Sequence, residues 1–511
     1  MLFIFRVDAS SSIGSGHVMR CLNLAHCLSF RGGRIIFVMR PLGGNLIERV
    51  KENGFDVLEI CSQFNDKIIS EEIDATEFVE VISNYEDVKH EEKHTKTWVV
   101  VDNYKLSSCW ESQVKRIFSR IVAIDDVADR THNVDLLIDQ NLVESENSRY
   151  DNLIPFYSET LIGPKYAMID SEYKFERCKL TRNSKIINNI IIYFGLSDKK
   201  MTLMAVESLC VLPNEFSALI VIDDHNVQIE SINRIVSADK RFRVSGQLPR
   251  LTHIMAESDL FVGACGTTSW ERLCLGLRAV VVTLADNQEA LARTLDKNGF
   301  IYWLGRSETI TKTTMVRGLK KALNTPLDPS IASRMMKMVD GLGAERVADM
   351  LMFDGSEGMK LRMVQKSDSD TILKWANDPD TRRNAFNNAQ ISKNEHSVWF
   401  RRQIDSPRIV FYLALTPHGE PVGHVRFEYQ PDHSWQISYL VAPFFRRRGV
   451  ARIMLQQCIA KIFDDLGNKF LSAYVKPTNI ASLRVFKLLG FTKSSQQDNP
   501  EAIRFELFRR F

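Results

Sequence analysis

Short β-rich segments alternate with stretches of helical periodicity up to about residue 350, and this alternation restricts the possible folds more than any other feature. The first series comprises FIFRV, RIIFVM, TWVVVDNY, RIVAIDD and DLLIDQ; after a polar stretch, a second comprises NIIIYFG, FSALIVID, DLFVGACG and LRAVVVTLA. Strands that alternate with helices form mostly parallel, doubly wound α/β sheets. The sequence therefore predicts two tandem α/β lobes, at residues 1–170 and 185–352.

The pattern changes after FDGSEGMK, near residue 353, whose glycine, serine and charged residues are typical of a linker. RIVFYLALT, EPVGHVRFEY and SWQISYLVA then follow one another closely, joined by Gly-Glu or Pro-Asp turns, which favours an antiparallel meander. We expect a linker at residues 353–359 and a third, α+β domain at residues 360–511. A chain of 511 residues is long enough for several such domains.

Composition and charge limit the class of protein. The nine cysteines are scattered without a C-x-x-C pair, and no apolar run approaches the roughly 18 residues of a membrane span. We therefore expect a cytoplasmic protein without a membrane partner. Residues 360–511 carry 24 Lys and Arg against 14 Asp and Glu. This excess includes the local cluster FRRRG, which a phosphorylated cofactor explains as well, so no nucleic-acid partner is expected.

The loop DASSSIGSGHVMRC lies between the first β-rich run and the first helical stretch. Gly14 and Gly16 allow the backbone to approach an anion at the helix start. The dinucleotide fingerprint fails because Met19 replaces its third glycine, and the P-loop fails because no Gly-Lys-Ser/Thr follows. His17 stands at the helix start, whose positive dipole favours a neutral imidazole that can take a proton from water. From position alone, capping or packing by His17 is an equally supported alternative.

The second lobe repeats the order strand, small-residue turn, helix and strand in DLFVGACGTTSWERLCLGLRAVVVTLADNQ. Thr268 and Ser269 begin the expected helix, and Glu271 falls in its first turn. A carboxylate there can accept hydrogen bonds from the two ribose hydroxyls while the helix start takes a pyrophosphate. The alternative is a surface acid that complements the helix dipole. Two such helix starts facing one cleft predict a nucleoside diphosphate site.

These segments resemble the UDP-2,4-diacetamido-2,4,6-trideoxy-β-L-altropyranose hydrolases of pseudaminic acid synthesis. The resemblance covers residues 1 to about 350 and rests on R-x-D-A-S-x-x-I-G-x-G-H-x-x-R-C from Arg6 to Cys21, VVVDNY, AIDDVADR, LIDQNL, GPKYA and GTTSWERLCLGL with its later NQ. It implies a two-lobed, glycosyltransferase-B-like fold and an inverting, metal-independent hydrolysis in which His17 activates or orients water. The expected substrate-binding residues are Asp8, Gly14, Gly16, Arg20, Tyr104, Thr268, Ser269, Glu271, Asn287 and Gln288.

No metal site is expected in this chain. His90 and His94 do satisfy the zinc-protease pattern H-E-x-x-H. That chemistry needs both histidines on one partly buried helical face, and KHEEKHTK has no apolar positions to bury such a helix. We interpret this segment as a solvated loop.

The segment FFRRRGVA follows a β-rich run and precedes a helical one. Its R-x-x-G-x-A pattern resembles the pyrophosphate loop of GCN5-related N-acetyltransferases (GNAT), and the later N-x-x-S-x-x-x-F-x-x-x-G-F resembles their closing helix. A solvated basic turn is the alternative. The resemblance implies that main-chain amides hold the diphosphate of acetyl-CoA and that the asparagine contacts the cofactor arm. The expected acetyl-CoA-binding residues are Leu440, Val441, Arg446, Arg447, Arg448, Gly449, Val450, Ala451, Asn479 and Ser482.

Acetyl transfer needs a neutral amine and a proton for the leaving thiolate. Many members of that family donate the proton from a tyrosine at the position of Phe486, so this chain must use another group or water. Tyr439, Tyr474 and His424 are candidates, and a water-relayed path is our preferred interpretation. The upstream segments WANDP and HSVWF resemble the acceptor side of enzymes that acetylate amino-sugars or protein N-termini. Their aromatic rings either stack on a uracil or form core.

Together the two resemblances predict a bifunctional enzyme of pseudaminic acid synthesis. It would hydrolyse UDP-2,4-diacetamido-2,4,6-trideoxy-β-L-altrose to UDP and free sugar, and it would use acetyl-CoA to acetylate the 4-amino group of the UDP-sugar precursor. The alternatives are a UDP-sugar glycosyltransferase or a non-catalytic sugar-nucleotide sensor, fused to a protein or small-molecule N-acetyltransferase. The expected partners are UDP-sugars and acetyl-CoA, and the oligomeric state stays open.

Overall fold

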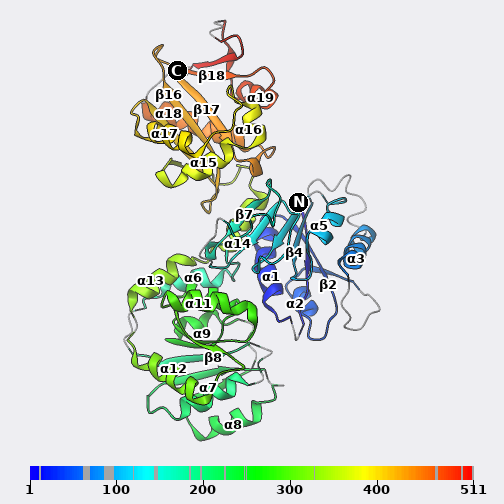
Figure 1. Cartoon of the computed structure of the whole chain (residues 1–511), viewed down its shortest axis with the longest axis vertical. Helices are drawn as coiled ribbons and strands as arrows, with labels where there is room; N and C mark the ends of the chain where they lie inside the picture. Colours follow the sequence, from blue (N-terminus) through cyan, green and yellow to red (C-terminus); the bar gives the residue numbers. More distant parts are fainter. Residues whose placement is uncertain are drawn as a thin grey trace. The chain divides into compact units, whose positions relative to one another are not determined.

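A computed structural model describes the chain except at residues 11–12, 61–69, 86–96, 119, 143–147, 183–185, 196–197, 199, 224–225, 247, 249, 327, 467–469, 496–498 and 509–511. The chain divides into two compact units, Met1–Val347 and Ala348–Phe511, whose elements are labelled in Figure 1. The division falls within helix α14 (Gly343–Met352).

The first lobe of the first unit is a seven-stranded parallel sheet with the order β3-β2-β1-β4-β5-β6-β7. Its central strands are buried on both faces, as the continuous apolar runs in the sequence require. The strands are β1 (Leu2–Val7), β2 (Arg34–Met39), β3 (Asp56–Glu59), β4 (Thr97–Asp102), β5 (Ile121–Ile124), β6 (Leu136–Asp139) and β7 (Glu159–Ile162). The helices are α1 (Gly16–Phe30), α2 (Ile47–Glu52), α3 (Glu71–Asn84) and α5 (Ser108–Val114); the next helix, α6 (Glu172–Lys179), packs against the second lobe.

The second lobe repeats this plan with a six-stranded parallel sheet in the order β10-β9-β8-β11-β12-β13. Its strands are β8 (Asn189–Tyr193), β9 (Ser217–Val221), β10 (Phe242–Ser245), β11 (Leu260–Ala264), β12 (Ala279–Thr283) and β13 (Ile301–Arg306). Its helices are α7 (Met201–Cys210), α8 (Ile229–Ala238), α9 (Thr252–Glu257), α10 (Thr268–Cys274), α11 (Glu289–Lys297), α12 (Lys312–Asn324) and α13 (Pro329–Met338).

In both lobes the strand order reverses beside the first strand, as in doubly wound nucleotide-binding folds. In the first lobe the reversal lies between β1 and β4, and in the second between β8 and β11. The predicted architecture of two doubly wound α/β lobes is confirmed. Because ligands bind outside the carboxyl ends of the strands at such reversals, the loops that precede α1 and α10 are the places to look for a site.

The second unit contains a mixed sheet in the order β14-β15-β16-β17-β18-β20-β19. The antiparallel meander expected from the sequence is confirmed as β15, β16 and β17. The strands are β14 (Lys360–Met363), β15 (Ile409–Leu415), β16 (Pro421–Tyr429), β17 (Trp435–Val441), β18 (Phe470–Val475), β19 (Thr492–Lys493) and β20 (Ile503–Phe508). The helices are α15 (Ser369–Ala376), α16 (Pro379–Asn384), α17 (Lys393–Asp405), α18 (Val450–Leu466) and α19 (Ile480–Leu488).

One irregularity of this sheet matters for function. Strands β17 and β18 are parallel neighbours, but they pair only at Trp435–Leu471 and Gln436–Ser472. Beyond these two pairs the strands diverge, and a wedge opens between their carboxyl ends. Among the strands that the structure describes, every other parallel pairing extends over three residues or more, so this early separation is specific to the second unit.

Candidate functional sites

His17 lies at the carboxyl edge of the first-lobe sheet, where the strand order reverses. Strands β1 and β4 pair with Val7 opposite Asp102, so the helix that follows β1 starts beside the end of β4. Gly14 has a φ of +84°, a left-handed conformation that lets the chain turn into that helix. His17 Nδ1 consequently lies 2.5 Å from Asp102 Oδ1.

The contact with Asp102 fixes the protonation pattern of the His17 ring. The Asp102 side chain is fully buried. Burial alone would raise its pKa, but Arg20 and His17 together hold that pKa well below its usual range. A carboxylate ionised at neutral pH can only accept hydrogen bonds, so His17 Nδ1 carries a hydrogen, and in the neutral ring Nε2 presents the lone pair.

Arg20, predicted to bind substrate, is held by two carboxylates of its own lobe. Its Nε and Nη2 atoms donate to the two oxygens of Asp102, each at 2.6 Å, and Nη1 donates to Asp126 at 2.8 Å. Arg20 is itself only 3% exposed. This geometry assigns Arg20 to holding Asp102 in place behind His17.

Tyr104 and Asn287, both predicted to line a sugar site, lie together near His17. The Tyr104 ring meets the His17 ring edge-on, with centroids 4.6 Å apart. Burial and the adjacent Asp126 raise the pKa of the Tyr104 phenol well above its usual range, so the phenol stays protonated and donates to Asp126 at 2.6 Å. Asn287 Nδ2, from the second lobe, lies 3.5 Å from the Tyr104 oxygen.

The two predicted helix starts also meet in the first unit. A Cβ atom placed on Gly16 would lie 3.0 Å from Thr267 Cγ2, so the start of α1 directly contacts the turn before α10. Gly16, Arg20, Thr267 and Glu271 line a small cavity there, of about 30 Å³. This volume accommodates about one water molecule. The cavity as it stands is therefore too small for a nucleotide.

Glu271 lines this cavity, and its carboxyl is a weaker acid than an exposed glutamate. Burial raises the pKa of its carboxyl to about 7, although a hydrogen bond from Tyr173 opposes the shift. A ligand that donates hydrogen bonds to such a carboxylate favours its ionised form and lowers its pKa. Glu271 is thus suited to accept from paired hydroxyls.

Several of the predicted substrate-binding residues have partners inside the protein. Asp8 accepts from the Arg40 amide at 2.8 Å and from Asn103 Nδ2 at 3.1 Å. Ser269 is fully buried, and its hydroxyl accepts from Arg272 at 3.0 Å. Gln288 Oε1 accepts from the Leu284 amide at 2.9 Å. Thr268 is the first residue of α10 and is partly exposed.

Asp102 and Asp126 were not singled out in the sequence, although both lie in the segments VVVDNY and AIDDVADR that carry the resemblance. Their positions at the ends of strands could have identified them. Asp102 ends β4, and Asp126 follows β5 by two residues. In a doubly wound sheet, a carboxylate at the carboxyl end of a strand near the reversal points toward the ligand edge.

The second unit contains a large cavity, of about 1640 Å³, that enters the wedge between β17 and β18. All ten residues predicted to bind acetyl-CoA line it. The loop before α18 includes two left-handed residues, Arg447 with a φ of +62° and Gly449 with a φ of +86°. The helix that this loop starts has 17 residues, and its first amides have no acceptor within the helix.

Two of the three arginines in this loop have structural partners. Arg446 forms an ion pair with Asp378 at 2.6 Å and donates to Thr381 at 2.7 Å. Arg448 donates to the carbonyl oxygen of Met350 at 2.7 Å and stacks on the rings of the preceding two phenylalanines. The main-chain amides and the Arg447 side chain, which lines the cavity, are therefore the groups of this loop that remain suited to an anion.

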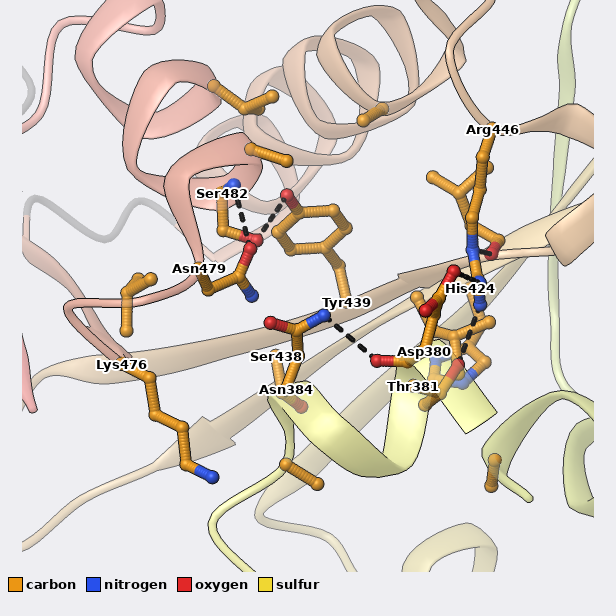
Figure 2. A pocket seen from close by; sticks show the side chains of 18 of the residues that line it. Asp380, Thr381, Asn384, His424, Ser438, Tyr439, Arg446, Lys476, Asn479 and Ser482 are labelled. Atoms are coloured by element: carbon orange, nitrogen blue, oxygen red, sulfur yellow. Dashed lines mark hydrogen bonds and ion pairs between the residues drawn. The ribbon is translucent and has the colours of Figure 1, made fainter. Parts of the chain in front are cut away.

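Asn479 caps α19 and fixes the position of Ser482 in the cavity wall. Its Oδ1 accepts from the Ser482 amide at 3.1 Å, and the Ser482 and Tyr439 hydroxyls lie 2.9 Å apart. Figure 2 shows these three side chains together on one side of the pocket. Tyr439 also packs edge-on against Phe486, with ring centroids 5.7 Å apart.

The other two candidates for the proton donor also line the cavity. Burial, with Arg426 and His396 nearby, lowers the pKa of His424 to about 3, so the imidazole is neutral at pH 7. Tyr474 accepts a hydrogen bond from Arg504 Nη1 at 3.2 Å.

The aromatic segment HSVWF divides between core and cavity. His396 and Phe400 are buried, at 2% and 4% exposure, and pack in the core, where His396 also borders the cavity. Trp399 is 37% exposed and lines the cavity, with the Arg426 guanidinium 5.7 Å from its ring centre. Of the two interpretations of these rings, stacking on a ligand fits Trp399 and core packing fits the other two.

Within the described ranges, no group of His, Cys, Asp or Glu side chains is arranged to hold a metal ion. The segment with His90 and His94 lies outside the described residues. Among the helices that the structure describes, none is long and apolar enough to cross a bilayer.

Comparison with known proteins gives separate matches for the two parts of the chain. The family model "Acetyltransferase (GNAT) domain" matches residues 359–492. The UDP-2,4-diacetamido-2,4,6-trideoxy-β-L-altropyranose hydrolase of Campylobacter jejuni is 26% identical over 301 residues, which cover 59% of this chain and 98% of that protein.

Two further matches span more of the chain. The uncharacterized protein MJ1062 of Methanocaldococcus jannaschii is 22% identical over 509 residues, covering 96% of each chain. The crystal structure of Acinetobacter baumannii MurG matches with a TM-score of 0.49 and 15% identity, covering 68% of this chain and 98% of that one. The chain thus joins an N-terminal region similar to a UDP-sugar hydrolase to a C-terminal domain that matches the GNAT acetyltransferase family model.

Proposed function

We propose that this chain is a bifunctional, cytoplasmic enzyme of pseudaminic acid synthesis. The first unit hydrolyses UDP-2,4-diacetamido-2,4,6-trideoxy-β-L-altrose to UDP and the free sugar, with inversion and without a metal ion. The second unit transfers an acetyl group from acetyl-CoA to the 4-amino group of the UDP-sugar precursor. The observation that carries the hydrolase proposal is the buried pairing of His17 with Asp102 at the strand-order reversal.

The proposed hydrolysis uses His17 Nε2 as the base. A water oxygen attacks the anomeric carbon, the bond between that carbon and the UDP oxygen breaks, and the water's proton passes to Nε2. Asp102 stabilises the resulting imidazolium because it already accepts the hydrogen of Nδ1 at 2.5 Å. Tyr104 and Asn287, which contact each other across the lobes, are placed to contact the sugar.

The nucleotide would lie between the starts of α1 and α10. Both starts present main-chain amides, and they approach within contact distance at Gly16 and Thr267. Glu271 would accept hydrogen bonds from the two ribose hydroxyls. Ser269 would contribute only through the packing of α10, because its hydroxyl is engaged by Arg272.

The proposed acetyl transfer takes place in the cavity of the second unit. Acetyl-CoA would lie in the wedge between β17 and β18, with its diphosphate at the loop before α18. Trp399 and the Arg426 guanidinium on its ring offer a flat aromatic surface beside a positive charge, which suits a nucleotide. The two reactions fit together chemically, since acetylation of a 4-amino sugar supplies the 4-acetamido group that the hydrolase substrate carries.

One experiment tests both activities. The full chain is incubated with the UDP-4-amino sugar, with and without acetyl-CoA, and the products are identified by mass spectrometry. We expect the acetylated UDP-sugar, UDP and the free diacetamido sugar only when acetyl-CoA is present. Acetylation without release of UDP would support the sensor alternative for the first unit. Release that requires an added acceptor would indicate a glycosyltransferase, and an unmodified amino sugar would contradict the proposed acceptor.

A further inference from the structure

Acetyl transfer releases CoA, so a proton must reach the sulfur when the C–S bond breaks. Phe486 on α19 has no acidic hydrogen, and its ring is buried at 2% exposure. We propose that Tyr439 donates this proton, with Ser482 as its hydrogen-bonded partner. The inference rests on the acetyltransferase function proposed above and assigns a catalytic residue within that site.

The place of Tyr439 in the sheet brings it to the wedge. Pairing between β17 and β18 ends at Gln436, and Tyr439 lies three residues further along β17. At about 3.3 Å per residue, its Cα lies about 10 Å beyond the last pair, where the strands have separated. Tyr439 lines the large cavity there, as does Tyr474 on β18.

The Tyr439 and Ser482 hydroxyls together have one hydrogen to offer. Their oxygens lie 2.9 Å apart, so one of their two hydrogens makes the bond between them. The other hydrogen can be donated to an acceptor in the cavity. Figure 2 shows the Tyr439 hydroxyl directed toward Ser482 at the start of α19, beside Asn479.

Both members of the pair are held in position by the protein. Asn479 Oδ1 accepts from the Ser482 amide at 3.1 Å, which fixes the first turn of α19. The Phe486 ring meets the Tyr439 ring at 78° with centroids 5.7 Å apart. Phe486 thus positions the phenol on the neighbouring strand.

The other candidates are less suited to this role. Tyr474 is the second phenol among the described residues that line the cavity; it accepts from Arg504, whose guanidinium lies 5.7 Å from its ring centre, so its oxygen lies beside Arg504 on β20 rather than in the hydrogen-bonded pair at the start of α19. His424 is neutral at pH 7 because burial lowers its pKa to about 3. His424 also pairs with Leu440 rather than Tyr439, so its side chain extends from the opposite face of the sheet.

The step balances without a further reactant. The amine nitrogen forms a bond to the acetyl carbonyl carbon, the electron pair of the C–S bond passes to sulfur, and sulfur takes the proton from Tyr439 Oη. The proton that the amine loses passes to water in the cavity. Water then returns a proton to the Tyr439 phenolate, directly or through the Ser482 hydroxyl.

The test uses the full chain with Tyr439→Phe and, as the matched control, Tyr474→Phe. Both substitutions remove one phenol oxygen from the cavity wall. For Tyr439→Phe we expect kcat for acetyl transfer to fall by about 10²-fold or more, with KM for acetyl-CoA changed by less than about threefold. We expect Tyr474→Phe to stay within about threefold in both constants. Tyr439→Phe with an unchanged kcat would overturn the proposal.

A pH profile separates proton donation from a structural role. Replacement of Tyr439 by 3-fluorotyrosine, a more acidic phenol, should move the alkaline limb of kcat to lower pH. An unmoved limb would overturn the proposal, because the alkaline limb follows the pKa of the phenol only if the phenol donates the proton. Failure of the unaltered chain to acetylate the amino sugar would overturn the proposed function together with this inference, whereas an active chain that tolerates Tyr439→Phe overturns the inference alone.

Discussion

Replacement of Asp102 by asparagine should disable hydrolysis by removing the charge behind His17 or by reversing the His17 tautomer. The amide side chain would retain the shape of the carboxylate but offer one acceptor and one donor group. Arg20 donates to both oxygens of Asp102, and His17 shares Oδ1, so the new NH₂ group faces the guanidinium in either orientation. At the Oδ1 position it also faces His17 and requires Nδ1 to accept, which places the hydrogen on Nε2 and removes the base; at the Oδ2 position the tautomer is kept, but the negative charge that stabilises the imidazolium is lost. We expect kcat for UDP release to fall on the order of 10³-fold or more.

The same substitution should also cost stability, by an amount set by the burial of the pair. The Asp102 side chain has no exposed surface and that of Arg20 only 4%. Breaking a buried ion pair from one side costs about 3 to 5 kcal/mol. Arg20 keeps Asp126 as a partner at 2.8 Å, so a loss near the lower end, about 3 kcal/mol, is expected. The protein should remain folded at 25 °C.

Asp126→Asn is the matched control. It removes the other carboxylate from Arg20 and the acceptor of Tyr104, but Asp126 does not touch the His17 nitrogen. Urea unfolding should show a similar loss of stability, whereas UDP release should fall by about tenfold or less. The reasoning is refuted if Asp102→Asn releases UDP within about threefold of the unaltered chain, or if both variants are equally inactive.

Three further predictions follow from the two sites. The affinity of the inactive His17→Ala chain for the UDP-sugar should rise about tenfold from pH 6 to pH 8, because ionised Glu271 accepts from ribose and its pKa is about 7; calorimetry with Glu271→Gln should show no such rise. Gly449→Ala should weaken acetyl-CoA binding by about 1 kcal/mol or more, since residue 449 has a φ of +86°, and unchanged affinity would contradict a rigid loop. A chain shortened to residues 360–511 should bind acetyl-CoA more weakly than residues 343–511, because the Met350 carbonyl that Arg448 binds is then missing; equal affinities would show that this contact is dispensable.

The features that could be predicted from the sequence are those that local patterns determine. Apolar runs alternating with helical periods predict two doubly wound lobes, and the glycines beside His17 mark the turn that the structure contains at Gly14. The resemblance named His17, Tyr104 and Asn287 together, and the structure places these side chains in contact in series. The loop predicted to bind a pyrophosphate and the closing helix were marked by the same kind of pattern, and the structure places that loop at the cavity and caps that helix with Asn479.

Long-range side-chain partners could not be predicted in this way. Arg20 and Asp102 are 82 residues apart, and Arg20 and Asp126 are 106 apart, so no local pattern links them. The same holds for Arg446, whose charge is paired with Asp378, 68 residues earlier in the chain. A charged side chain within a motif is interpreted as a ligand-binding group when the sequence alone is known, because an oppositely charged partner elsewhere in the chain is not visible in the motif. The structure is what separates binding residues from positioning residues here.

The proposed role of His17 is tested most directly by hydrolysis of the UDP-sugar in ¹⁸O-labelled water, with NMR detection of the first anomer released. If His17 directs water to the anomeric carbon, the label should enter the free sugar and not UDP, and the inverted anomer should appear first. His17→Ala should lose at least about 10³-fold in rate while still binding UDP. Label in the UDP phosphate, or undiminished release by His17→Ala, would contradict this mechanism.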